Sequence, residues 1–235
     1  GLAQSNNWIS AYLMSKLNPS QFVQLLRDYG INNPDIHASM SLCLGPCEVS
    51  VSEMVSAYTA FANHGIRTAP MFVSRIEDNE GNTIATFQPR MNEVISADNA
   101  MKMLYMMMGV VDNGTAGRLR YRYKLEGQIG AKTGTTNNNS DGWFIAFTPQ
   151  LVSGCWVGCE DRDIHFDSMS MGQGATMALP IWAIFMKKVY ADVSLGYSPE
   201  VKFDIPADYN PCYHVGSGGE QDSFEQVNAI DEVFE

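Results

Sequence analysis

The sequence contains few basic residues and no long hydrophobic run. Of its 235 residues, 15 are Lys or Arg and 26 are Asp or Glu, which gives a formal net charge of −11. Binding to nucleic acid through its phosphates needs a surplus of cations, so this charge argues against a nucleic-acid partner. No run of about 18 apolar residues is present, and no signal peptide opens the sequence. We therefore expect no membrane-spanning or targeting segment within these residues.

Cysteine is scarce and histidine is scattered. Cys43 and Cys47 form one pair and Cys155 and Cys159 another, but neither spacing is typical of zinc sites, and no His is suitably placed. Two strand residues four positions apart lie about 13 Å from each other, so the second pair is not expected to form a disulfide. The spacing leaves open a local disulfide between Cys43 and Cys47. We expect no metal and no cofactor.

Enough apolar and aromatic residues are present for a globular unit with a sizeable core. Hydrophobic residues make up 45% of the chain and aromatic residues 11%, which is more than disordered chains carry. The C-terminal end differs, because eight acidic residues and no basic residue occur from Asp204 onward. We therefore divide the chain into a folded domain, residues 1–192, and an acidic C-terminal extension, residues 193–235, which is loosely ordered or lies over the surface.

Apolar residues recur at helical spacing in five segments. Ser50 and Glu53 form a capping-box pattern at the start of one of them. The expected helices are Gln4–Leu17, Gln21–Tyr29, Ser50–Gly65, Ser96–Val111 and Ala178–Val189.

Strand patterns occupy two other regions. A polar turn separates two short strand-like segments, which predicts a hairpin, and three further apolar segments read as strands of a sheet. The hairpin is Met71–Glu77 with Thr83–Phe87, and the sheet strands are Gln128–Lys132, Gly142–Thr148 and Leu151–Cys159. Helices followed by strands and a closing helix favour an α+β fold, an antiparallel sheet packed with helices.

The segment Lys132–Thr136 carries the clearest chemical signal. A Lys at a strand end, with hydroxyls at the next and third positions, provides donors for an anion. Strand alternation places Lys132 and Gly134 on one face, and Thr133 and Thr135 on the other. A glycine allows a ligand backbone to approach the strand edge, so an extended peptide could add to it. The alternative is an ordinary surface strand end, while a phosphate-binding loop is excluded because Ala131 precedes the Lys.

A second candidate lies at the N-terminus. Ser5 and Asn7 stand at the head of the first expected helix, where they can present a hydroxyl and an amide to a cleft. The alternative is a simple helix cap, since Ser and Asn are favoured at that position. Trp143 and Phe144 begin the strand that follows the Lys132–Thr136 segment. We expect one of them to pack in the core and the other to line the cleft.

Taken together, the Ser-x-Asn and Lys-Thr-Gly motifs resemble those of the penicillin-binding and serine β-lactamase superfamily. The resemblance covers roughly residues 1–190 and is closest to the transpeptidase domain of class A, bifunctional penicillin-binding proteins. The further matching segments are Leu44-Gly45, Glu48-Val49-Ser50, Ala57-Tyr58, Phe61-Ala62-Asn63, Gly114-Thr115-Ala116, Asp141-Gly142-Trp143-Phe144 and Trp156-Val157-Gly158.

This resemblance implies a partial penicillin-binding transpeptidase fold and a role for each motif residue. Ser5 would relay protons, Asn7 would bond the substrate amide, and Lys132 would supply positive potential. Thr133 and Thr135 would bind the substrate carboxylate, and the Thr135 N–H would form half of an oxyanion hole. The implied substrate-binding segment is Thr133, Gly134, Thr135 and Thr136.

One departure from the family pattern concerns the nucleophile, which is the Ser of a Ser-x-x-Lys motif. None of the seven Lys residues has a Ser three positions before it. We therefore expect that the chain starts after the nucleophile or lacks it, and that the chain alone is inactive. We also expect it to expose apolar surface that favours self-association.

For the complete protein, the resemblance implies a peptidoglycan D,D-transpeptidase. It would cross-link stem peptides by serine acyl transfer from D-Ala-D-Ala, be the target of β-lactams, and also carry a glycosyltransferase. It would act on the periplasmic face of the membrane, anchored by an N-terminal segment absent from this sequence. Two alternatives are a non-catalytic peptide-binding or cell-wall-binding module of the same fold, and a D,D-carboxypeptidase or β-lactamase that uses water as acceptor.

Overall fold

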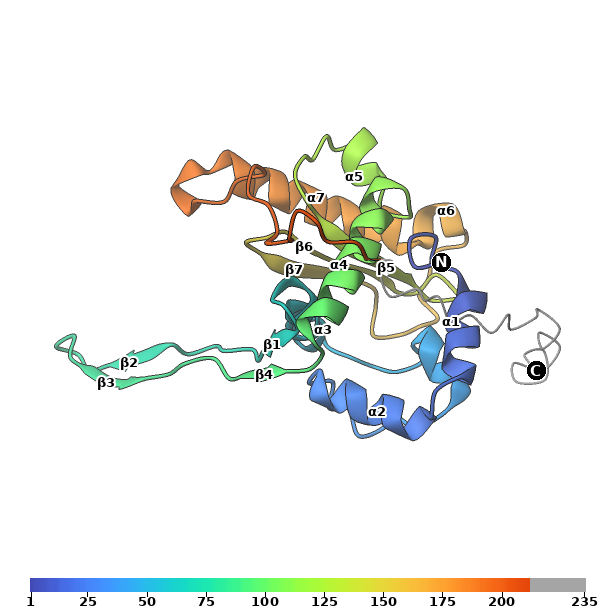
Figure 1. Ribbon diagram of the computed structural model, residues 1–235, viewed down its shortest axis with the longest axis horizontal. Coiled ribbons are helices and arrows are strands. Elements are labelled where there is room, and N and C mark those ends of the chain that lie inside the picture. The colour runs from blue at the N-terminus through green and yellow to red at the C-terminus, as the bar shows by residue number, and fades with distance from the viewer. Residues whose placement is uncertain (212–235) are drawn as a thin grey trace.

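The structure, a computed structural model, describes residues 1–211, so the expected acidic extension lies outside the described part for every residue after Pro211. Its centre is a three-stranded antiparallel sheet in the order β5-β6-β7. Helix α7 packs on one face of this sheet, α3 packs against β6 and β7, and α4 packs against β5 (Figure 1). The expected α+β class is therefore confirmed. The sheet strands are β5 (Gly130–Thr135), β6 (Gly142–Phe147) and β7 (Val152–Val157).

Strand β5 differs from the prediction in length. The sequence predicted that it ends at Lys132, but the strand continues to Thr135. Its pairing with β6 places Lys132 opposite Ile145 and Gly134 opposite Trp143. The continuation depends on this cross-strand pairing, which local sequence signals do not report. As a result, the whole Lys-Thr-Gly-Thr segment lies on one regular strand edge.

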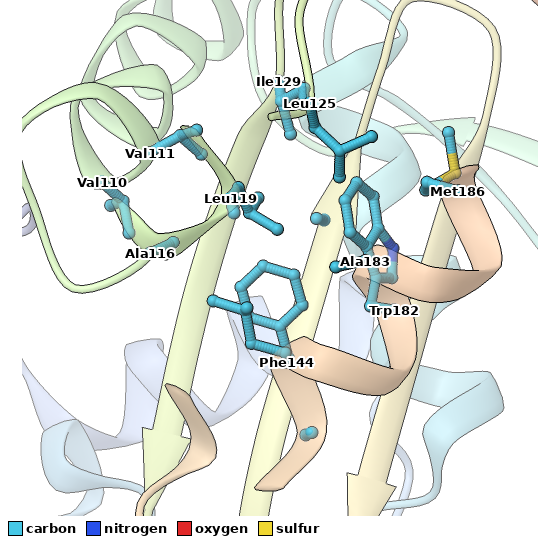
Figure 2. Close-up of a cluster of buried hydrophobic side chains, with 14 of the residues drawn as sticks. Val110, Val111, Ala116, Leu119, Leu125, Ile129, Phe144, Trp182, Ala183 and Met186 are labelled. Carbon is cyan, nitrogen blue, oxygen red and sulfur yellow. The ribbon is translucent and has the colours of Figure 1, made fainter. Parts of the chain in front are cut away.

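The main core lies between the sheet and α7 (Gly174–Ala191). Phe144 of β6 is fully buried, and its ring meets that of Trp182 edge-on with the centroids 5.5 Å apart (Figure 2). The Trp182 indole N–H donates to Ser153 Oγ at 2.8 Å, which satisfies its buried polar atom. Val110 and Val111 close the cluster from α4 (Ala97–Asp112), and α5 (Arg118–Tyr121) adds Leu119. This core fixes β5 and β6 against α4 and α7.

The N-terminal elements form a smaller helical layer. The predicted capping box is present, since the Ser50 hydroxyl accepts from the Glu53 N–H and the Glu53 carboxylate accepts from the Ser50 N–H. The first helix begins later than predicted, at Asn7, because Asn6 is its cap and accepts hydrogen bonds from the N–H groups of Trp8 and Ile9. The elements are α1 (Asn7–Ser15), α2 (Pro19–Asp28), the 3-10 helix η1 (Met40–Leu44) and α3 (Val51–Ala62). Cys43 and Cys47 are free thiols.

The predicted hairpin forms an arm that extends away from the body (Figure 1). Its outer strands are β2 (Arg75–Glu77) and β3 (Thr83–Thr86), which pair antiparallel. A second, unpredicted ladder joins β1 (Ile66–Thr68) to β4 (Met91–Glu93) at the base of the arm. The arm exposes large apolar side chains, of which Phe72 is 87% exposed.

The chain after α7 packs back onto the body as far as the structure describes it. The short helices α6 (Met169–Gly172) and η2 (Val193–Leu195) flank α7. The Phe203 ring meets the buried Phe147 ring at 5.9 Å, and the Phe203 N–H donates to Gln128 Oε1 at 2.7 Å. Tyr209 stacks on Tyr105 of α4 with centroids 5.5 Å apart. Among residues 1–211 no helix has the length and apolar character needed to cross a membrane.

Candidate active site

The two motifs of the sequence meet at one point of the structure. The Lys132 ammonium on β5 donates a hydrogen bond to Ser5 Oγ at 2.8 Å, although the two residues lie 127 positions apart in the chain. The same ammonium donates to the carbonyl oxygen of Thr133 at 2.8 Å. A hydroxyl and a cation are therefore held side by side at the edge of the sheet.

Ser5 occupies a backbone conformation that non-glycine residues rarely adopt, with φ at +54°. The Ser5 N–H donates to the carbonyl of Leu2, and the Asn6 N–H donates to that of Gly1, so a tight turn holds this conformation. The preceding residue is fixed as well, because Gln4 Nε2 donates to the Asn113 carbonyl at 2.8 Å. Such strain is often found at functional positions, where it fixes a side chain in advance.

The cap and the candidate amide turn out to be different asparagines. Asn6 supplies the cap of α1, so this role does not fall to Ser5 or Asn7. Asn7 is exposed, and within residues 1–211 its side-chain amide has no hydrogen-bond partner. The amide is therefore free to bind a ligand two residues from the Ser5 hydroxyl.

The outer edge of β5 presents backbone groups as well as side chains. Across the ladder, the Thr136 N–H donates to the carbonyl of Asp141 at 3.2 Å. Peptide groups alternate in direction along an antiparallel strand, so the N–H and C=O groups of Thr133 and Thr135 face away from β6. The Lys132 bond to the Thr133 carbonyl agrees with this direction. The Thr135 N–H therefore points away from the sheet and can donate to a ligand at this edge.

The charge of Lys132 is not balanced by a carboxylate. None of the four ion pairs in residues 1–211 includes it. Burial lowers the pKa of the Lys132 ammonium below the ordinary lysine value, because a poorly solvated site disfavours the charged form. An unpaired, partly buried cation of this kind favours binding of an anion.

The threonines of the motif have three different environments. Thr133 Oγ1 lies 2.8 Å from Thr115 Oγ1, and Thr135 Oγ1 accepts a hydrogen bond from the Gly174 N–H at 2.9 Å. Both hydroxyls keep hydrogen-bonding capacity for a ligand. Thr136 Oγ1 instead accepts from the N–H groups of Ser140 and Asp141 and shapes the β5–β6 loop. Its substrate-binding role stays a prediction.

Thr115 is a site residue to which sequence reasoning assigned no role. It follows α4 and appears in the sequence only as part of the Gly114-Thr115-Ala116 segment. No local pattern links it to Thr133, because their contact joins two separate elements.

The expectation that one of Trp143 and Phe144 packs in the core is confirmed for Phe144. Trp143 is half-buried beside Gly134, and its place in a cleft stays a prediction.

Comparison with known proteins agrees with this fold. Residues 1–154 match the family model of the penicillin-binding protein transpeptidase domain. The chain belongs to this family, and the resemblance noted from the motifs is confirmed.

The relatives are class A proteins of the penicillin-binding protein 1A type. The chain is 32% identical over 213 residues to penicillin-binding protein 1A of Aquifex aeolicus, covering 89% of this chain and 28% of that protein. It is 31% identical over 192 residues to penicillin-binding protein 1A of Neisseria meningitidis serogroup A, covering 79% and 23%. The chain thus spans about a quarter of these relatives.

Solved structures show the same fold. The crystal structure of penicillin-binding protein 1A from Haemophilus influenzae superposes with a TM-score of 0.77 at 24% identity, over 88% of this chain and 35% of that one. PonA1 from Mycobacterium tuberculosis gives a TM-score of 0.69 at 23% identity, over 84% and 56%. At these identities the likeness concerns the fold.

Proposed function

We propose that this chain is the substrate-binding part of a peptidoglycan D,D-transpeptidase. The observation that carries the proposal is the Lys132–Ser5 hydrogen bond beside the open edge of β5. Family membership and the penicillin-binding protein 1A relatives support the same activity. The complete protein would cross-link stem peptides, and the present chain would hold the donor peptide during that reaction.

The donor is a stem peptide that ends in D-Ala-D-Ala. Its extended backbone pairs with the outer edge of β5, and its terminal carboxylate is held by the Thr133 and Thr135 hydroxyls in the field of Lys132. The Asn7 amide bonds a peptide amide of the same substrate. An unpaired cation and two hydroxyls at a strand edge match a carboxylate better than a neutral group.

The reaction is acyl transfer in two steps. A serine oxygen attacks the carbonyl of the penultimate D-Ala, and the peptide bond breaks as the terminal D-Ala leaves. Ser5 passes a proton toward the leaving nitrogen, with Lys132 holding the Ser5 hydroxyl in place. The Thr135 N–H stabilises the oxyanion of the tetrahedral intermediate. The amine of a second stem peptide then attacks the ester and releases the serine.

The nucleophilic serine is supplied from outside these 235 residues, since no Ser-x-x-Lys motif occurs in them. The chain by itself therefore neither acylates nor transfers peptide. A membrane anchor and a glycosyltransferase belong, in this proposal, to the remainder of the protein, which places the site on the periplasmic face.

β-Lactams are the inhibitors expected for such a site. PonA1 has been solved in complex with penicillin V, and penicillin-binding protein A of M. tuberculosis as an imipenem acyl-enzyme. In this chain the β-lactam carboxylate would occupy the position of the terminal D-Ala carboxylate, next to Lys132 and Thr133.

A fluorescent penicillin tests the proposal. The complete protein should be labelled covalently, and Lys132→Ala should abolish labelling, whereas the 235-residue chain alone should stay unlabelled. Labelling of the chain alone would overturn its proposed dependence on an external serine. A complete protein that binds stem peptide without being labelled would be a non-catalytic binding module. Product analysis with and without an amine acceptor separates transfer from hydrolysis by a carboxypeptidase or β-lactamase.

A further inference from the structure

Thr115 touches both halves of the candidate site. Its backbone N–H donates to the carbonyl of Ala3 at 3.0 Å, two residues before Ser5. Its hydroxyl lies 2.8 Å from that of Thr133, the residue after Lys132. One residue therefore links the segment that carries Ser5 to the strand that carries Lys132.

The approach on the Ala3 side is close. A Cβ atom added to Gly114 would lie 2.2 Å from the Ala3 carbonyl oxygen, which is closer than Cβ atoms come to other atoms. The glycine thus allows the chain after α4 to reach the N-terminal turn and to place Thr115 against β5. The contact with Ala3 uses the backbone N–H of Thr115, so the Thr115 hydroxyl remains available to Thr133.

We propose that Thr115 is a positioning residue that orients the Thr133 hydroxyl toward the substrate carboxylate. This inference rests on the proposed function. A hydroxyl has one proton to donate and two lone pairs to accept. When Thr115 donates to Thr133 Oγ1, the Thr133 proton is free to point at the carboxylate, and the hydrogen-bonded pair polarises that proton further.

Without the Thr115 hydroxyl, Thr133 keeps its side chain but loses the partner that fixes its proton. The effect should therefore appear in the binding of carboxylates and not in the binding of neutral ligands. The Ser5–Lys132 hydrogen bond involves neither the Thr115 nor the Thr133 hydroxyl, so it should persist in the variant.

The test uses the complete protein with Thr115→Val, Thr115→Ser and Thr133→Val, and with Thr86→Val as a matched control on the exposed strand β3. Valine has the shape of threonine and keeps the backbone N–H that holds Ala3. The ligands are a penicillin and its carboxyl methyl ester. The dissociation constant of the first complex and the acylation rate constant are measured separately by stopped-flow fluorescence.

We expect Thr115→Val to weaken binding of the free acid by about 10-fold. Binding of the ester should change less than twofold, and Thr115→Ser should restore the wild-type value. In the Thr133→Val background, Thr115→Val should have no further effect, because it acts through Thr133.

Equal losses for acid and ester would show a general structural role and overturn the assignment, as would an undiminished loss in the Thr133→Val background. A wild-type protein that binds neither ligand would overturn the proposed function together with this inference, which distinguishes the two failures.

Discussion

The Ser5 hydroxyl and the Lys132 ammonium are joined by a 2.8 Å hydrogen bond between an N-terminal turn and the central sheet. Ser5 reaches this position through a left-handed backbone conformation, and Lys132 through a strand whose partner is buried on both faces. Each motif alone is also compatible with an ordinary strand end or helix cap. Their value for chemistry arises from the fold that brings them together.

The stability of the protein should depend on the protonation of Lys132. Its pKa is lowered in the folded state, so between that pKa and about 10.4 the unfolded chain binds the proton and the folded chain does not. The free energy of unfolding should therefore rise with pH across this window, and the burial cost is fully present below it. Urea unfolding of the chain between neutral pH and the top of the window measures the rise.

Lys132→Met should remove this pH dependence. The free energy of unfolding of the variant minus that of the wild type should therefore fall as the pH rises. Burial raises the pKa values of Tyr29 and Tyr58 to about 12. This effect lowers stability above about pH 10 in both proteins, so it cancels in the comparison. Lys187→Met, at an exposed position of α7, controls for the loss of one charge. A difference that stays constant with pH would contradict the prediction.

Two adjacent asparagines should separate stability from binding. Asn6→Ala removes the cap of α1 and should lower the free energy of unfolding by about 1 kcal/mol. Asn7→Ala should change it by less than about 0.5 kcal/mol, because Asn7 is exposed. In the complete protein, Asn7→Ala should nevertheless reduce labelling by penicillin. Denaturant unfolding and labelling rates measured on the same two variants test whether Asn6 serves stability and Asn7 serves binding. A large stability loss from Asn7→Ala would contradict this division.

The chain between residues 193 and 211 should contribute to the stability of the domain. Phe203→Ala should cost about 2 kcal/mol, since the ring packs on Phe147. Phe72→Ala is the matched control, because that ring is 87% exposed and should contribute almost nothing. A chain that ends at residue 192 should melt at a lower temperature than one that ends at residue 211. Equal melting temperatures would support the domain boundary at residue 192.

The isolated chain should self-associate. Strand β7 pairs only with β6 among the described residues, which leaves its other edge open, and the arm exposes Phe72 and Ile84. Sedimentation velocity should show a weight-average mass that grows with concentration. Phe72→Ser with Ile84→Ser should reduce this growth if the arm is responsible, and a wild-type chain that stays monomeric throughout would disprove the expectation.

The sequence predicted those elements whose signals are local. The capping box at Ser50, the turn between β2 and β3, and the apolar run in β6 each identify an element within about ten residues. The pairing of Ile66 with Glu93 was not predicted, because each of these strands has three residues and gains its order from the other. Helix α6 was missed for a similar reason, since a four-residue helix carries no periodicity.

The site was predictable only as far as motifs reach. Ser5 and Lys132 were found as separate motifs, and family resemblance joined them. The contact of Thr115 with Thr133 joins a helix end to a strand, so no spacing reveals it. Thr136 shows the reverse case, because its position in the motif suggests a ligand while its hydroxyl oxygen accepts two amides of its own loop.

The distance along the chain between Ser5 and Lys132 also has a consequence for biosynthesis. A ribosome adds about 5–20 residues per second, so the 127 positions between them correspond to about 6–25 s of translation. During that interval the serine has emerged without the lysine that is to hold it. The proposed substrate-binding surface is therefore completed late in synthesis, and we expect a nascent chain stalled before β5 not to bind a β-lactam.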